Sequence, residues 1–147
     1  MKKTILILPF LIFFALATDS SAAGIGINFG QPHDIALSLK SSNSKTSYDF
    51  AVSWANSGLY LHANYLLSTY IISRTMPLYA GLGLRTNLRE GSSDFGLRIP
   101  LGMSMYFSKL EVFFEIAPSV MLLPSMSFFT DPSQSYGIGV RYHISRF

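Results

Sequence analysis

Residues 48–55 read Tyr48-Asp49-Phe50-Ala51-Val52-Ser53-Trp54-Ala55. Large apolar side chains occupy every second position, and the positions between them carry small or polar side chains. Because successive side chains of a β-strand point to opposite faces, this period of two predicts a strand with one apolar face and one polar face.

Seven further segments complete this pattern. The first is a short opening strand at residues 24–29. The other six repeat the period of two, at residues 35–40, 59–65, 78–85, 95–106, 111–117 and 136–144. Turn residues such as Asn56-Ser57-Gly58 separate the segments, and almost every connection is short. Short connections join antiparallel neighbours. Since no helical period appears after residue 23, the sequence predicts an all-β fold, a single antiparallel up-and-down barrel of eight strands.

The first and last segments share a Gly-Ile-Gly motif, at Gly24-Ile25-Gly26 and Gly137-Ile138-Gly139. Once a sheet closes into a barrel, its first and last strands become neighbours. We therefore expect these two segments to lie side by side.

The N-terminus has the features of a secretory signal peptide. Lys2 and Lys3 form a positive start, residues 5–16 are an apolar run, and Ser21-Ala22-Ala23 offers small residues for cleavage before Gly24. The run falls short of the roughly 18–20 residues that a spanning helix needs, although an uncleaved N-terminal anchor is an alternative. We expect residues 1–23 to be a signal peptide and residues 24–147 to be one outer-membrane barrel domain.

Composition excludes several classes of function. Apolar residues make up 49% of the 147 residues and charged residues only 13%, against about a quarter charged in ordinary soluble proteins. The leader holds two lysines and one aspartate, so nine basic and seven acidic residues remain, and a net charge of +2 is too weak for a nucleic-acid-binding surface. There is no cysteine, and His33, His62 and His143 lack the spacing of a zinc site. We expect no cofactor, no metal and no nucleic-acid partner.

The charged residues indicate which face of the barrel points inward. Those identified within the strands lie on the face opposite the large apolar side chains; they are Asp49, Arg85, Arg98, Glu111, Glu115 and Arg141. An eight-stranded barrel encloses only enough space for packed side chains, which glycines and a few long ionic side chains would fill. The apolar face then points outward into lipid, because a soluble secreted barrel, the alternative, needs a far more charged exterior. We expect the six charged residues to form an ion-pair network in the lumen.

Four motifs carry a resemblance to a known family: Pro77-Leu78-Tyr79-Ala80-Gly81-Leu82-Gly83-Leu84-Arg85, Arg98-Ile99-Pro100-Leu101-Gly102, Phe114-Glu115-Ile116-Ala117-Pro118 and Gly137-Ile138-Gly139-Val140-Arg141-Tyr142. In this order they resemble a bacterial family of small, mostly uncharacterised outer-membrane barrels, similar in design to the OmpA transmembrane domain and to OmpX. The resemblance covers essentially all of the chain after the leader. It implies an eight-stranded barrel and supplies no known enzymatic activity.

The C-terminus departs from that family. Barrels that resemble these usually end on an aromatic residue in phase with the last strand, which the barrel-assembly machinery reads. Phe147 is terminal, but it shares the phase of Arg141, whereas Tyr142 and Ile144 have the lipid-facing phase. Either a bulge near Ser145 restores the phase or the last three residues are a tail. The resemblance implies the assembly machinery as a partner through the C-terminal strand.

Two constellations raise the question of catalysis. Glu111 and Glu115 could suggest a glycosidase, but four positions along one strand separate their backbones by about 13 Å. His143-Ile144-Ser145 contains the His-x-Ser pair of some lipid-A-trimming barrels. Such a site needs a third, orienting carboxylate and must face the outer leaflet, whereas these residues lie at the chain end, which belongs on the periplasmic side. We expect no catalytic residues and a protein that is not an enzyme.

Loop lengths limit the surface available to partners. If both termini are periplasmic, the outer connections follow the first, third, fifth and seventh strands. Only the last, residues 124–135, is long enough to contact a surface partner, through Met126, Phe128 and Phe129, or else to pack over the barrel mouth. Residues 68–76 are expected to form a long periplasmic segment.

These observations favour a small integral outer-membrane protein that is surrounded by outer-membrane lipid and has a structural or envelope-maintaining role. The alternative is a narrow pore, or a surface barrel that binds a ligand or host factor. A lipid-A-modifying enzyme or a secreted lipocalin-like barrel is the third possibility.

Overall fold

The computed structural model describes residues 22–31, 34–43, 46–55, 58–73, 75–89, 92–123, 127–130 and 136–144. The described residues form eleven labelled strands: β1 (Ala22–Gly30), β2 (Ile35–Ser42), β3 (Thr46–Ala55), β4 (Gly58–Ser73), β5 (Met76–Arg89), β6 (Ser92–Arg98), β7 (Leu101–Phe107), β8 (Leu110–Ile116), β9 (Ser119–Leu123), β10 (Ser127–Thr130) and β11 (Tyr136–His143). Within these residues, no helix is long and apolar enough to cross a membrane.

Pro100 and Pro118 divide two long barrel strands into separately labelled halves. β6 and β7 pair with β5 in one unbroken register, and β8 and β9 continue each other against β7 and β6. The backbone ladder runs through both breaks, because Gly81 N donates to Pro100 O and Ile99 N donates to Pro118 O, each at 2.9 Å. Proline has no N–H to donate, so each proline interrupts its strand without ending it.

The eighth barrel strand consists of β10, which pairs with β9, and β11, which pairs with β8. Residues 131–135, between them, lie outside the described part of the chain. β11 closes the barrel on β1, with Gly24 opposite His143 and Gly30 opposite Gly137. Every pairing between neighbours is antiparallel. The structure therefore confirms the predicted closed, eight-stranded antiparallel barrel and the pairing of its first and last strands.

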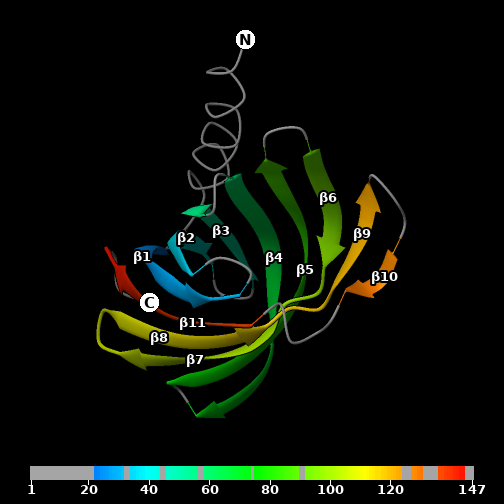
Figure 1. Cartoon of the computed structure of the whole chain (residues 1–147). Helices are drawn as coiled ribbons and strands as arrows, with labels where there is room; N and C mark the ends of the chain where they lie inside the picture. The colour runs from blue at the N-terminus through cyan, green and yellow to red at the C-terminus, as the bar shows by residue number, and fades with distance from the viewer. Residues whose placement is uncertain are drawn as a thin grey trace.

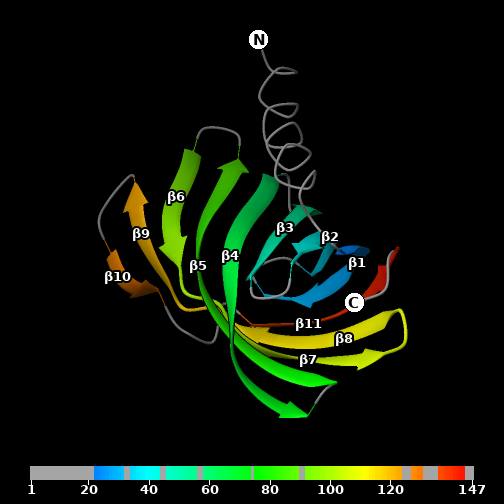
Figure 2. The same cartoon turned by 180° about the vertical axis from the view of Figure 1, so that it is seen from behind.

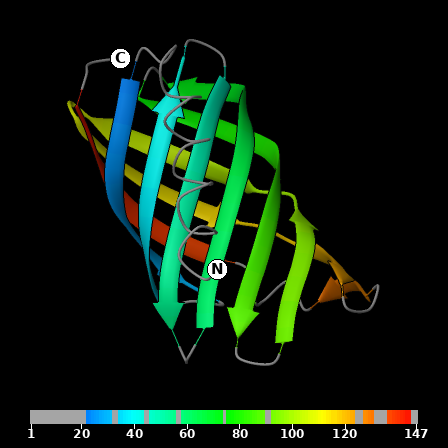
Figure 3. The same cartoon turned by 90° about the horizontal axis from the view of Figure 1, so that it is seen from above.

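The sheet curls around a central axis (Figures 1 and 2), and a side view shows the strands tilted against that axis (Figure 3). We call the end that holds the start of β1 and the end of β11 the terminal rim; the β2–β3, β4–β5 and β7–β8 connections lie at this end. We call the other end the opposite rim; the β1–β2, β3–β4, β5–β6 and β9–β10 connections lie there.

The expectation of a long segment at residues 68–76 is wrong. β4 continues to Ser73 and β5 begins at Met76, with which Ser73 pairs. Register shifts between Ser68 and Tyr70 and between Ile71 and Ser73 interrupt the ladder. Such bulges hide the period of two from the sequence, although the aromatic and β-branched residues of this segment favour a strand.

Side-chain burial alternates with the predicted period in β8 and β11, whereas in β3 residues 49–53 are all buried, including Phe50 and Val52 of the outward phase. In β11 every second residue is buried, starting at Gly137 and including Arg141 and His143, whereas Ile138 and Tyr142 are exposed. In β11 the exposed positions are large and apolar and the buried positions are small or polar, which reverses the usual distribution in a soluble domain. The interior of the barrel is therefore the polar side of the sheet.

Candidate functional site

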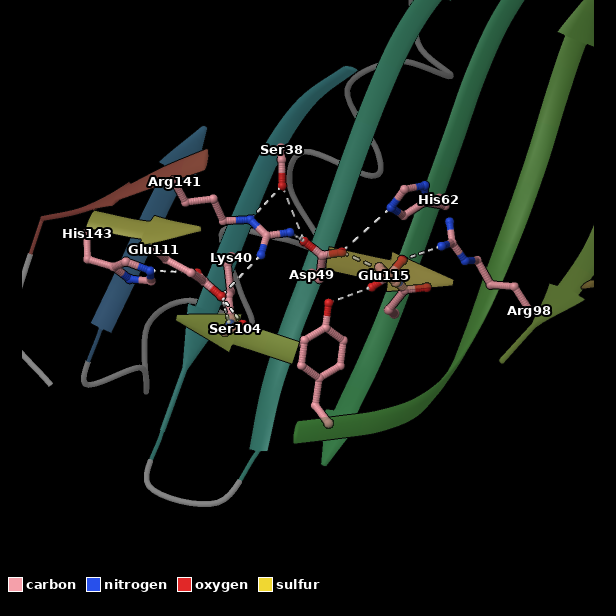
Figure 4. A network of polar contacts seen from close by, with 12 residues as sticks. Ser38, Lys40, Asp49, His62, Arg98, Ser104, Glu111, Glu115, Arg141 and His143 are labelled. Carbon is pink, nitrogen blue, oxygen red and sulfur yellow. Dashed lines mark hydrogen bonds and ion pairs between the residues drawn. The ribbon is translucent and has the colours of Figure 1, made fainter. Parts of the chain in front are cut away.

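The barrel interior holds a network of charged and polar side chains (Figure 4). Its ionisable members come from six strands and are nearly all inaccessible to solvent; they are Lys40 of β2, Asp49 of β3, His62 of β4, Arg98 of β6, Glu111 and Glu115 of β8, and Arg141 and His143 of β11. Each occupies an inward-facing position of its strand, so the alternation that buries glycine and serine elsewhere directs these side chains toward the axis.

Glu111 is the centre of the network near the terminal rim. Its Oε1 accepts hydrogen bonds from Lys40 Nζ and Ser104 Oγ, both at 2.6 Å, and from Tyr106 OH at 3.2 Å. Its other oxygen, Oε2, lies 2.8 Å from Nε2 of His143. A carboxylate with no exposed surface is stable only when it is paired and hydrogen-bonded, and these contacts satisfy both requirements.

Asp49 forms the next part of the network, toward the middle of the barrel. Arg141 pairs with its Oδ1 and also donates from Nε to Ser38 Oγ at 2.7 Å. Asn64 Nδ2 donates to Asp49 Oδ2 at 3.1 Å, and His62 Nε2 lies 3.6 Å from the same oxygen. Arg141 Nη1 is also 3.6 Å from Glu111 Oε1, so this guanidinium connects the two carboxylate centres.

Aromatic side chains pack against the charged groups. The Arg141 guanidinium lies over the Phe113 ring at 3.7 Å from the ring centre, and Lys40 Nζ lies 5.6 Å from the centre of the Tyr106 ring. Contacts of this kind stabilise a cation that has lost its water.

Arg98 and Glu115 form a third centre, closer to the opposite rim. Arg98 Nη2 pairs with Glu115 Oε1, and Tyr79 OH donates to Glu115 Oε2 at 3.2 Å. Figure 4 shows the guanidinium pointing at the carboxylate. Across all three centres, the paired cations Lys40, Arg98 and Arg141 equal in number the carboxylates Asp49, Glu111 and Glu115. The charges of these six groups balance, which limits the cost of burying them.

Five of the six charged residues named from the sequence meet in this network; they are Asp49, Arg98, Glu111, Glu115 and Arg141. Arg85 is only half-buried, and its described contact is a donation from Nη2 to the sulfur of Met121 at 2.8 Å. Gly83 is the residue of β5 that pairs with Arg98, and Arg85 lies two residues beyond Gly83 toward the opposite rim. Among the described residues, Arg85 forms no ion pair.

Sequence reasoning overlooked Lys40 as a member of the network. Lys40 shares the inward phase of Ala36 and Ser38 in β2, so the same alternation could have identified it. The network also includes hydroxyl groups, which the pattern of charged residues does not indicate; they belong to Ser38, Ser104, Tyr79 and Tyr106.

Several named residues lie outside what the structure describes. His33, Met126, Ser145 and Phe147 are not among the described residues, and the side chains of Phe128 and Phe129 in β10 are not described. The expectation of one long loop over residues 124–135 is wrong, because residues 127–130 form β10 and pair with β9. The surface contact predicted for this segment and the phase of Phe147 are not tested. Within the described part of the chain, no group of three or more His, Cys, Asp or Glu residues could hold a metal ion.

These features define a class of protein: an eight-stranded antiparallel β-barrel with an apolar exterior and a charge-paired polar interior. Comparison of the chain with protein-family models, with curated proteins and with solved structures finds no match.

Proposed function

We propose that this chain is a small integral β-barrel of a bacterial outer membrane, with a filled lumen and a structural, non-catalytic role in the cell envelope. The observation that carries the proposal is the exposed apolar exterior. Leu82 and Trp54 are 69% and 66% exposed, and large apolar side chains from nearly every strand are exposed with them. A continuous apolar surface on this scale is a contact surface, and on a closed barrel with a polar interior its natural contact is lipid.

Aromatic side chains at both rims support this proposal. Trp54 and Tyr136 are exposed near the opposite rim, and Phe107 and Tyr142 are exposed near the terminal rim. Transmembrane barrels carry such girdles where the hydrocarbon meets the headgroups. The resemblance of four motifs to OmpA-like and OmpX-like barrels points to the same location.

Secretion through a cleaved signal peptide belongs to the proposal. Residues 1–21 lie outside the described part of the chain, and β1 begins at Ala22. Cleavage before Gly24 would remove Ala22 and Ala23, which pair with Ser42 and Ser41. The remaining β1 residues keep their pairing with β11, so cleavage there is compatible with a closed barrel.

The filled lumen supports a structural role over conduction. Arg141 of β11 reaches Asp49 of β3, and Lys40 of β2 reaches Glu111 of β8, so two ion pairs join strands that are not neighbours across the interior. The two carboxylates of a possible glycosidase pair are engaged by different cations, Glu111 by Lys40 and Glu115 by Arg98. A narrow pore would require these pairs to separate.

Fractionation tests the proposal directly. The protein, expressed in a Gram-negative bacterium, should sediment with the outer membrane, resist extraction by alkaline carbonate and migrate differently on a gel with and without boiling. In planar bilayers it should give no sustained open-channel current. Recovery as a soluble periplasmic protein would refute the membrane location, whereas a sustained current would refute only the filled, non-conducting lumen.

A further inference from the structure

Lys109 lies at the terminal rim, in the tight connection between β7 and β8. The connection consists of Ser108 and Lys109, and Ser108 has a φ of 59°, a left-handed conformation that is typical of such tight turns. The neighbouring strand also holds Lys109, because its carbonyl oxygen accepts a hydrogen bond from His143 N at 2.8 Å. The backbone therefore fixes the place of Lys109 at the rim.

The ammonium of Lys109 lies beside the outward face of the barrel. Its Nζ is 5.9 Å from the centre of the Tyr142 ring, and Tyr142 has the outward phase of β11 and is 52% exposed. Phe107 and Leu110 flank the connection and are exposed as well. A long cationic side chain over an exposed aromatic ring, at the edge of an apolar belt, is the arrangement expected where hydrocarbon meets polar headgroups.

The connections at the two rims carry opposite charges. Those at the terminal rim contain Lys45, Arg74 and Lys109 and no aspartate or glutamate. Those at the opposite rim contain Asp34 and Glu90 and no lysine or arginine. Residues 45, 74 and 90 lie outside the described part of the chain, and their places in the sequence assign them to these connections. This distribution favours an anionic surface at the terminal rim only.

The carboxylates of the lumen do not neutralise Lys109. Glu111 is the carboxylate closest to it in the sequence, but Glu111 is buried on the inward face and is bonded to Lys40 and His143. Within the described part of the chain, Lys109 forms no ion pair. Its charge is therefore available to a partner outside the barrel.

We propose that the terminal rim binds the anionic headgroups of phosphatidylglycerol-type phospholipids, with the Lys109 ammonium at the headgroup phosphate and Tyr142 in the interface beside it. Lysine is a common partner of phosphate, and one lysine near an anionic membrane surface raises affinity by about fivefold. A zwitterionic headgroup such as phosphatidylcholine carries a cation of its own, which cancels much of this attraction. The inference rests on the proposed membrane location and adds the class of lipid at one end of the barrel.

The test uses a tryptophan at each rim. Trp54 of the parent reports on the opposite rim, and the double variant Trp54→Phe with Phe107→Trp reports on the terminal rim, two residues from Lys109. Each protein is reconstituted in vesicles of phosphatidylcholine and phosphatidylglycerol, with bromine on the acyl chains of one lipid or the other. We expect quenching of the terminal reporter to show a preference of about fivefold for phosphatidylglycerol, and Trp54 to show no such preference.

Variants of the terminal reporter assign the preference to one side chain. Lys109→Gln should reduce it toward the value at Trp54, and Lys109→Arg should retain it. Arg89→Gln is the matched control, because it removes an exposed cation near the opposite rim, and it should leave the preference unchanged. Salt at roughly 1 M should weaken the preference, since the Debye length is then only about 3 Å. A heat-modifiability gel shows whether each variant is folded.

Three results would overturn the inference and leave the membrane location standing. They are equal quenching of the terminal reporter by the two brominated lipids, a preference for phosphatidylglycerol that Lys109→Gln retains in full, and equal loss of the preference in Lys109→Gln and Arg89→Gln. Absence of quenching by either lipid, at both reporters, would instead refute the membrane location and this inference with it.

Discussion

Arg141 and Asp49 are 92 residues apart in the sequence, and they form a fully buried ion pair in the barrel interior. The pair joins β11, which closes the barrel, to β3 on the other side of β1 and β2. Because the same guanidinium also approaches Glu111 of β8, one side chain connects three strands that do not all neighbour one another. The lumen network therefore links distant parts of the barrel wall as well as filling the space.

Removal of this guanidinium should strongly destabilise the barrel. Arg141→Met removes the buried cation that Asp49 and Glu111 share. Removal of one partner of a buried ion pair lowers the free energy of unfolding by about 3–5 kcal/mol. Urea-induced unfolding in lipid vesicles would show the loss as a lower midpoint. The double variant Arg141→Met with Asp49→Asn should regain part of the stability, because it removes the unpaired carboxylate as well.

An Arg141→Met variant as stable as the parent would contradict the assignment of this residue as the connecting cation. Arg85→Met is the matched control, since Arg85 is also an inward-phase arginine but is half-buried and forms no ion pair with the described residues. We expect that control to change the unfolding midpoint much less.

Neutralising Arg98 should affect stability more than conductance. Arg98→Gln removes the cation paired with Glu115, while Arg141, Lys40 and their partners still occupy the lumen. We expect a lower unfolding midpoint and planar-bilayer currents no larger than those of the parent. A large, sustained open-channel current from Arg98→Gln would mean that this pair closes a pore, and the alternative of a narrow channel would replace the structural role.

The free-energy cost of a charged substitution on the outward face should depend on how deep the substituted position lies in the membrane. Leu82 lies near the middle of β5 and is 69% exposed. If this face were exposed to water, Leu82→Arg would change stability very little. If Leu82 lies at the middle of a bilayer, the same substitution costs about 2–4 kcal/mol. Phe107→Arg, at the terminal rim, is the control and should cost about 0–1 kcal/mol. Folding efficiency into vesicles would measure both changes, and equal behaviour of the two would contradict the lipid-facing assignment.

The alternation of side chains was enough to predict the barrel and most of its interior. Asp49, Arg98, Glu111, Glu115 and Arg141 all follow it into the network, because strand period and burial are directly coupled. The pairing partners within the lumen could not be predicted, since they depend on how far each strand is shifted along its neighbour.

Local irregularity accounts for only part of what sequence reasoning missed. The bulges of β4 between Ser68 and Ser73 disturb the period and made a strand resemble a loop. Lys40 was overlooked although it lies in phase with Ser38. The breaks at Pro100 and Pro118 are visible in the sequence as prolines, but the sequence does not show that the ladder continues through them.

Trp54 provides the most direct test of the central proposal, that the apolar face of the barrel contacts lipid. It is the only tryptophan in the chain, it is 66% exposed, and it lies on the outward face near the opposite rim. In vesicles, its fluorescence should shift to the blue and be quenched by lipids brominated near the headgroup region, while dissolved iodide should quench it weakly. Strong quenching by iodide with no effect of brominated lipid would place Trp54 in water and contradict the membrane barrel.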